Sequence, residues 1–441
     1  MSEMERKTIN IPEISRVEGH CAVHVDIKDK NVVNVTLDVF EGTRFFEKIV
    51  LGHKFSELPH ITSRVCAICS TGHVLAAAYA IERIYKYNPG RATRILRELM
   101  HLGMIIESHA THIYALALPD YLGVGDLLQF ASSHQKEFST WNTLRNLGGT
   151  IQTVIGGRPF HPVSLQIGGL SHYPSVGQLQ ELNSLLQEAK DLAIDTCQLL
   201  LKFKPAVART SKPIFMALIP DDGVYGYFGD TIKCSEGWQR SIDDYRLYLN
   251  EVPVKGSHAK RSTFEGKPVM VGSMARLFLF SDHLVDTSRS IYEITALAHG
   301  DTNSLWNNLA QAIEIVEAVE RSQKLIKELC DEPALLLEGI VPDGSLRCLP
   351  AQAGKSVGAV ECPRGTLYHY YEIDNTGTVL AADMITPSAQ NSHRIEVDIK
   401  EVVAQCDDIA KPDLQKQLET LVRAYDPCNT CATHMVSVKV K

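Results

Sequence analysis

Hydrophobic and polar positions alternate near the two ends of the chain, as they do in strands that bury one face. The alternation runs through residues 9–40, where a turn at residues 29–31 predicts an antiparallel hairpin or small sheet. It returns in residues 357–388, where Asn375-Thr376-Gly377 is a strong hairpin signal. Both ends of the chain are therefore predicted to form small β-rich segments.

Between these segments, apolar residues recur at the spacing of amphipathic helices. Ser70-Thr71 are good N-cap types ahead of an Ala- and Leu-rich helix that extends to Tyr87. Further helices are predicted over residues 42–52, 91–118, 127–147, 177–203, 304–330 and 412–425. Pro119 is predicted to stop the helix over 91–118, and a glycine-framed loop is predicted over 148–170. The predicted fold class is mainly α with small β-rich segments (α+β).

This pattern divides the chain into an N-terminal β-rich segment (1–63), a helical core (64–335) and a C-terminal β/α part (336–434). No repeat or clear linker separates them, so we expect one compact unit. The 441 residues are 44% hydrophobic and 22% charged, as in an ordinary globular protein. A net charge of −8 and the lack of a Lys/Arg-rich run argue against a nucleic-acid partner.

The cellular location is predicted from the N-terminus, the apolar runs and the cysteines. MSEMERKTIN is charged and has no apolar core, so it is not a secretory signal. No apolar run approaches the roughly 20 residues of a spanning helix, so direct membrane insertion is not expected. Eleven cysteines with two CxxC pairs favour a reducing compartment, the cytoplasm, and metal or redox roles over disulfides.

The two CxxC pairs are the strongest chemical signal in the sequence. Cys66 and Cys69 come just before the helix that starts at Ser70, where the helix dipole favours thiolate over thiol. Cys428 and Cys431 form the second pair, in DPCNTCATH. Thiolates suit zinc, iron–sulfur clusters and nickel, and a shared redox or catalytic metal is the favoured interpretation. The alternatives are a dithiol or unrelated pairs, and a structural zinc site, whose pairs are usually only about 15–20 residues apart.

Isolated polar residues carry weaker signals. Glu18 in SRVEGH is a proton carrier or, more simply, a buried carboxylate paired with Arg16. Arg364 in ECPRG is a ligand clamp or, more often, a surface charge. His161 and His73 are most simply core histidines with satisfied hydrogen bonds. No GxGxxG or Walker motif occurs, so nucleotide binding is unsupported, and a redox metal would need an electron-accepting partner.

Six motifs resemble, in order and context, those of nickel–iron hydrogenase large subunits: RVEGH, RVCAICSTGH, GGRPFHP, VECPRGTLYHYYEID, ITPSAQN and DPCNTCATH. They span the whole chain, and their joint occurrence is highly specific. The resemblance implies the large-subunit fold with a central bundle of long helices. It also implies a catalytic subunit that splits or forms dihydrogen heterolytically and passes electrons to an iron–sulfur small subunit.

The resemblance also implies the composition of a metal centre. Cys66 and Cys428 would be terminal ligands of nickel, while Cys69 and Cys431 would bridge to an iron that carries cyanide and carbon monoxide. The pocket around these diatomic ligands would be formed by four residues: Pro363, Arg364, Pro387 and Ser388. Arg364 would lie over the metals near one cyanide, and Ser388 would donate to the other.

Proton transfer and a second ion follow from the same resemblance. Cys428 would be the base that takes the proton, because a metal lowers the ~8.5 pKa of a free cysteine. Arg364 would polarise the bound molecule or act as the base itself, and Glu18 would be the first proton-relay carboxylate. A distal magnesium or iron ion would be held by three groups: Glu47, the backbone carbonyl of Met384 and His434.

Two features indicate the branch of the family and the partners. Ser108 stands where membrane-bound and periplasmic members carry an Asp, which resembles the cytosolic, cofactor-coupled branch of bidirectional and sulfhydrogenase-like enzymes. That branch pairs the small iron–sulfur subunit with diaphorase-type or heterodisulfide-type subunits. Residues 435–441, after His434, resemble a cleavable tail, which implies a maturation protease and nickel-insertion chaperones. The alternatives are a hydrogen sensor, a relative from energy-converting complexes and, remotely, a structural zinc protein.

Overall fold

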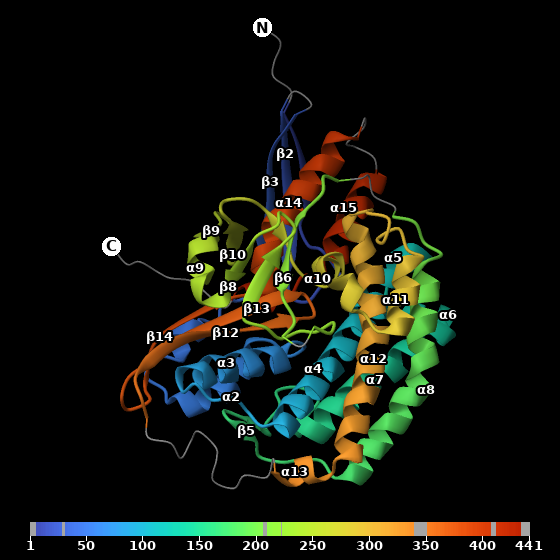
Figure 1. Cartoon of the computed structure of the whole chain (residues 1–441). Coiled ribbons are helices and arrows are strands. Elements are labelled where there is room, and N and C mark those ends of the chain that lie inside the picture. The colour runs from blue at the N-terminus through green and yellow to red at the C-terminus, as the bar shows by residue number, and fades with distance from the viewer. Residues whose placement is uncertain are drawn as a thin grey trace.

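Four long helices lie side by side in the molecule: α4 (Arg91–Thr111), α7 (Gln135–Gly156), α8 (Val176–Leu200) and α12 (Asn307–Asp331) (Figure 1). The computed structural model describes residues 6–28, 31–205, 210–221, 223–338, 351–406 and 412–433. The first half of α12 is buried on nearly every side, because α4, α8 and α10 (Ser273–Phe280) pack around it. The predicted fold class, mainly α with small β-rich segments, is confirmed.

Three helix predictions differ clearly from the structure. The helix expected over 42–52 is only the four-residue α1 (Phe46–Ile49). The predicted helix over 127–147 is α6 (Leu127–Ser133) followed by α7, which continues through the predicted glycine loop to residue 156. Gly148 sits where α7 meets α4, and a Cβ there would lie 2.4 Å from the carbonyl oxygen of Gly103, so this glycine serves helix packing. Pro119 does not end its helix either. A π-helical segment (His112–Ala117) joins α4 to α5 (Leu118–Leu122), and Pro119 lies in the first turn of α5, where its missing N–H is harmless.

Two three-stranded antiparallel sheets are formed by the two ends of the chain. β1 (Arg6–Ile11), β2 (Cys21–Lys28) and β3 (Asn31–Val39) pair in that order, and β12 (Gly354–Cys362), β13 (Gly365–Ile373) and β14 (Val379–Ile385) do likewise. β2 and β3 form the predicted hairpin, although turn residues 29 and 30 lie outside the described residues. The β13–β14 hairpin is confirmed, with Gly377 at φ +74° in the turn.

Three helices connect these sheets to the cysteines. α3 (Ser70–Ile84) packs on β12 and β13, and α14 (Pro387–Ala404) packs on β3. α15 (Pro412–Ala424) packs against α14 and leads to the short helix α16 (Asn429–Ala432). One hydrophobic core includes side chains from the N-terminal sheet, the long helices and α15. Within the described residues, no helix is both long enough and apolar enough to cross a membrane.

The other elements are short. The further helices are α1 (Phe46–Ile49), α2 (Leu58–Thr62), α9 (Tyr245–Tyr248), α11 (Asp286–Glu293) and α13 (Ala334–Glu338). The further strands are β4 (Leu165–Gln166), β5 (Gly169–Leu170), β6 (Ile214–Leu218), β7 (Thr231–Cys234), β8 (Gln239–Ser241), β9 (Leu249–Pro253), β10 (Lys260–Phe264) and β11 (Val269–Met270). Of these, β11, β6, β7 and β8 pair in that order in a four-stranded sheet.

Candidate metal centre

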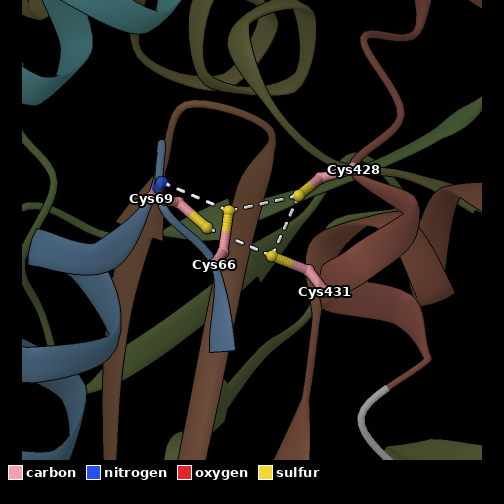
Figure 2. Close-up of side chains that lie close together, drawn as sticks. All are labelled: Cys66, Cys69, Cys428 and Cys431. Carbon is pink, nitrogen blue, oxygen red and sulfur yellow. Dashed lines mark hydrogen bonds between the residues drawn. The ribbon is translucent and has the colours of Figure 1, made fainter. Parts of the chain in front are cut away.

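The four cysteines of the two CxxC pairs converge on one buried point (Figure 2). Their Sγ atoms all lie within 4.8 Å of one another. The Sγ–Sγ distances are 3.4 Å for Cys66–Cys428, 3.1 Å for Cys69–Cys431 and 3.0 Å for Cys428–Cys431. Each side chain is at most 4% exposed. The structure therefore brings two cysteine pairs that are far apart in the sequence to one cluster of four sulfurs.

Each cysteine pair lies at the N-terminus of a helix, as the sequence predicts for the first pair. Cys69 is the N-cap residue of α3, and its backbone N–H donates to the Sγ of Cys66 at 3.4 Å. Cys428 is the N-cap residue of α16, which carries Cys431 in its first turn. A CxxC sequence at the start of a helix turns both thiols to the same side of the backbone. The two pairs face each other across the cluster, as Figure 2 shows.

The four sulfurs fit a thiolate-bound metal centre. All four cysteines are free thiols rather than disulfides. A metal–sulfur bond of about 2.3 Å lets one ion join sulfurs up to about 4.6 Å apart, close to the limit within which these four lie. Hydrogen bonds from the Cys428, Cys431 and Cys69 thiols hold the pKa of Cys66 well below its ordinary value. The cluster can therefore carry thiolate, the form that binds soft and borderline metals.

Arg364 is a buried residue beside the cluster, so its interpretation as a surface charge is wrong. It follows β12, is 5% exposed and donates from Nε and Nη2 to the backbone oxygen (2.7 Å) and Oδ1 (2.9 Å) of Asp426. Its charge interacts with the thiols of Cys428, Cys66 and Cys69. Nη1 is buried without a partner in the described part of the chain. Arg364 thus offers the site a fixed positive charge and an N–H donor that no described residue accepts.

Side chains from α4 and α12 hold Asp426 in place. Gln311 on α12 donates from Nε2 to Oδ2 of Asp426 at 3.1 Å, and its own Oε1 is hydrogen-bonded to Nδ1 of His112, the first residue after α4. One turn along both helices, His109 Nε2 lies 2.8 Å from Glu314 Oε2. Both pairs use residues three apart, which face the same way on a helix. Asp426 has a left-handed backbone (φ +51°), and these contacts with Arg364 and Gln311 stabilise it there.

Arg276 on α10 supports the strand end that precedes Arg364. Its guanidinium donates to Glu314 at 2.6 and 2.7 Å, to Glu361 Oε2 at 2.8 Å and to the carbonyls of Cys362 (2.9 Å) and Pro363 (3.2 Å). Burial alone would raise the pKa of Glu314, but the charge and hydrogen bonds of Arg276 hold it well below its ordinary value. Sequence analysis missed Arg276 and Glu314, since neither belongs to a motif.

Glu18 lies beside Cys428, and the expectation that it pairs with Arg16 is wrong. Arg16 donates instead to the carbonyl of Leu116 (2.8 Å) and to Asp120. The Glu18 carboxylate accepts the Thr430 backbone N–H at 3.0 Å and the Thr430 hydroxyl. Burial, and secondly the Cys428 charge, raise the pKa of Glu18 to about 8. The carboxyl group can therefore hold or release a proton near neutral pH.

Ser388, Pro387 and Pro363 surround the backbone near Cys428 and Arg364. Pro387 begins α14, and the next residue, Ser388, accepts the backbone N–H of Cys428 at Oγ (2.8 Å). Since the Ser388 oxygen accepts this bond, its O–H remains a donor. Pro363 directly precedes Arg364, and its backbone carbonyl accepts a hydrogen bond from Arg276. All three residues therefore lie next to Cys428 or Arg364.

The structure brings together two of the three residues expected to bind a distal ion. Glu47, on α1, accepts the backbone N–H of Met384 at Oε1 (2.6 Å). The group of Met384 that was expected to bind the ion is its carbonyl oxygen. The observed hydrogen bond involves its N–H, so it does not place the carbonyl oxygen next to Glu47. His434 lies outside the described residues. Ser108 is buried on α4, and its Oγ has no hydrogen-bond partner among the described residues.

Comparison with known proteins gives agreement over nearly the whole chain. A family model described as nickel-dependent hydrogenase matches residues 44–147 and 222–434. Sulfhydrogenase 1 subunit alpha of Pyrococcus furiosus is 35% identical over 97% of this chain and 98% of its own length. NAD-reducing hydrogenase HoxS subunit beta of Cupriavidus necator is 28% identical over 98% of this chain and 95% of its own. A crystal structure of NAD+-reducing [NiFe]-hydrogenase in the H2-reduced state superposes with a TM-score of 0.85 at 26% identity, covering 97% of this chain and 99% of that one.

Proposed function

Because the chain belongs to the nickel-dependent hydrogenase family, we propose that its four buried sulfurs hold the nickel–iron centre of a hydrogenase catalytic subunit. The protein is an oxidoreductase that acts on dihydrogen. The observation that carries the assignment of the centre is the convergence of all four Sγ atoms within 4.8 Å. No finding favours a hydrogen sensor, an energy-converting relative or a structural zinc protein.

Within this centre we assign each sulfur a role. Cys66 and Cys428 would be the terminal nickel ligands, and Cys69 and Cys431 would be the sulfurs shared with iron. This division follows the family resemblance, and the Cys69–Cys431 distance of 3.1 Å lets both sulfurs reach one second ion. Elemental analysis should find one nickel and one iron per chain and no zinc. A Cys428→Ser variant should lose nickel, whereas Cys197→Ser, at a buried thiol in α8, should keep it. Zinc at one equivalent without nickel would overturn the assignment.

The iron is proposed to carry cyanide and carbon monoxide in a pocket formed by Pro363, Arg364, Pro387 and Ser388. Two observations support it. Arg364 has a buried N–H group without a partner among the described residues, and Ser388 has an O–H that is left to donate. A cyanide nitrogen is an acceptor that these two donors would satisfy. Infrared bands of carbon–nitrogen and carbon–oxygen triple bonds in the purified protein would test the proposal, and their absence would contradict it.

When bound, the centre supplies the electron-accepting metals at which dihydrogen is split heterolytically. The residues of the chain then handle the proton. Cys428 is the proposed base, and its Sγ lies 3.8 Å from the hydroxyl of Thr430. Thr430 in turn donates to Glu18. Since the pKa of Glu18 is raised to about 8, mainly by burial, its carboxyl group is suited to accept a proton and pass it on. Arg364, whose charge is fixed by Asp426, would polarise the substrate.

The relay is tested by replacing Glu18. A Glu18→Gln variant can still accept the Thr430 backbone N–H at its amide oxygen and donate from its amide nitrogen to the Thr430 hydroxyl. It cannot carry a proton, so hydrogen/deuterium exchange should fall by at least about tenfold, the low end of what a positioned acid–base group contributes. Nickel and iron contents should stay at the wild-type level. Glu13→Gln, at an exposed carboxylate on the same loop, serves as the control. Unaltered exchange in Glu18→Gln would exclude the relay role.

A distal magnesium or iron ion is proposed at Glu47, the carbonyl of Met384 and His434. Support comes from the half-buried carboxylate of Glu47, which lies next to the Met384 backbone, and from the oxygen ligands that magnesium prefers. Elemental analysis of Glu47→Gln should show the loss of one magnesium or iron equivalent, with nickel retained. An unchanged metal content would refute this site.

The partners and location are proposed from the relatives, which are named as subunits alpha and beta of larger hydrogenases. We propose an iron–sulfur small subunit and, beyond it, diaphorase-type or heterodisulfide-type electron-transfer subunits in the cytoplasm. Maturation would involve nickel-insertion chaperones and a protease that removes residues 435–441. Affinity purification from the native cell, followed by a test for hydrogen-dependent NAD+ reduction, would identify the acceptor. Mass spectrometry of the same sample would show whether the chain ends at His434.

A further inference from the structure

Three buried side chains form a hydrogen-bonded array that ends at one of the cluster sulfurs. His73 Nε2 lies 3.7 Å from Cys431 Sγ, and His73 Nδ1 lies 3.0 Å from His369 Nε2. His369 Nδ1 lies 2.8 Å from the hydroxyl oxygen of Tyr371. All three side chains are at most 1% exposed. We call His73, His369 and Tyr371 the histidine array.

Two elements of the fold align the histidine array. His73 is in the first turn of α3, four residues after Cys69. His369 and Tyr371 are two residues apart on β13, so their side chains leave the same face of the strand. α3 packs on β13, which brings the His73 and His369 rings to a centroid distance of 5.1 Å. The array therefore runs from the end of the cluster that carries Cys431 into the sheet.

The chemistry of the sulfur sets the direction of every hydrogen bond in the array. A metal-bound cysteine is a thiolate, which can only accept, so Nε2 of His73 must carry the hydrogen. In a neutral imidazole the other nitrogen is then an acceptor, so Nδ1 of His73 receives the N–H of His369 Nε2. By the same rule Nδ1 of His369 is an acceptor, and the Tyr371 hydroxyl must donate to it.

We propose that the Tyr371 hydroxyl is a positioning group for the metal centre: it fixes the tautomers of both histidines and so delivers an N–H hydrogen bond to the Cys431 sulfur. This inference rests on the proposed function, because the direction of the array follows from a metal-bound Cys431. A thiolate that accepts a hydrogen bond donates less electron density to its metals, and hydrogen bonds to sulfur ligands tune metal-centre potentials. Tyr371 thus acts on the centre from a distance, through two imidazole rings.

The test is infrared spectroscopy of the assembled, metal-loaded complex. Tyr371→Phe removes only the oxygen, so the bond to Cys431 should weaken, the metals should become more electron-rich, and the carbon monoxide and cyanide bands should shift to lower wavenumber. Placing 3-fluorotyrosine at position 371 keeps the shape but strengthens the donor, and should shift the bands the opposite way. Tyr227→Phe is the control, since Tyr227 is as deeply buried and its hydroxyl has no partner among the described residues.

A double variant separates an action through the array from a general structural effect. His369→Phe should shift the bands by itself, and adding Tyr371→Phe should cause no further shift, because the connection is already broken. Bands that stay at the wild-type position in Tyr371→Phe, or single shifts that simply add, would overturn the inference and leave the proposed function intact. Complete absence of such bands from the wild-type complex would refute the diatomic ligands and this inference together.

Discussion

Replacing Arg276 by Met should destabilise the protein more than any exposed ion-pair change. The guanidinium is 1% exposed and is the cation that balances two carboxylates, Glu314 and Glu361. Removing one partner from a buried ionic group costs about 3–5 kcal/mol. The carbonyls of Cys362 and Pro363 also lose a donor, which adds about 1 kcal/mol each. Against a total stability of about 5–15 kcal/mol, this loss should lower the melting temperature by roughly 10 °C.

The loss should grow as the pH rises. In the wild type, Arg276 holds the pKa of Glu314 below its ordinary value, so ionised Glu314 stabilises the folded state at neutral pH. Without Arg276, burial is opposed mainly by the contact with His109, and the pKa of Glu314 should rise above its ordinary value. The folded variant then binds more protons than the unfolded chain, and its unfolding free energy falls as the pH increases.

Thermal and urea unfolding at about pH 6 and about pH 8 would check both the size and the sign of the effect. Arg321→Met is a matched control, because Arg321 on α12 pairs with Glu98 on α4 at 2.7 Å but both side chains are 16% exposed. Because this pair is partly exposed, its loss should cost less than the loss of the fully buried Arg276. If Arg276→Met unfolds within about 1 kcal/mol of the wild type at both pH values, the buried-charge account of this network is incorrect.

Three further changes can be tested in the same unfolding assays. Gly148→Ala should lower the unfolding free energy by at least about 2 kcal/mol, because its Cβ would lie 2.4 Å from the carbonyl oxygen of Gly103. In the control Gly149→Ala, the Cβ would meet only Pro159 at 3.5 Å, so this change should be neutral or stabilising. Equal effects of the two changes would argue against a tight crossing of α4 and α7. Burial raises the pKa of Glu317 from 4.5 to about 7, so the contribution of Glu317 to the unfolding free energy should fall by about 3 kcal/mol as the pH rises between these values. Glu317→Gln should remove that part of the slope, and parallel pH profiles of wild type and variant would contradict it. Asp120→Asn leaves Arg16 and Arg423 without their shared carboxylate and should cost about 3 kcal/mol; a loss below about 1 kcal/mol would show that the two cations find other partners.

The sulfur cluster could be predicted because its signal is local. Each CxxC pair needs only four consecutive residues, and Ser70-Thr71 marked the helix that starts behind the first pair. The β13–β14 hairpin was equally accessible, since Gly377 supplies the left-handed conformation that the turn requires. Motifs of this kind carry their geometry within a few residues.

The support around the cluster could not be predicted, because its partners are distant in the sequence. Arg16 lies two residues from Glu18, yet its left-handed backbone (φ +58°) directs the side chain to Asp120, 104 residues away. Arg364 is held by Asp426, 62 residues away. The glycines of α7 were taken for a loop because composition alone does not show that Gly148 packs against α4. Tertiary contact decides such positions, and a single sequence carries no signal for it.

The centre takes two sulfurs from each end of the polypeptide, and Cys66 and Cys428 are 362 residues apart. On a ribosome that adds ~5–20 residues per second, the first pair emerges about 20 to 70 s before the second exists. During that interval the nascent chain displays a bare dithiol that any thiophilic ion in the cell can reach. An ion held by all four sulfurs can therefore be bound only after the second pair has been synthesised.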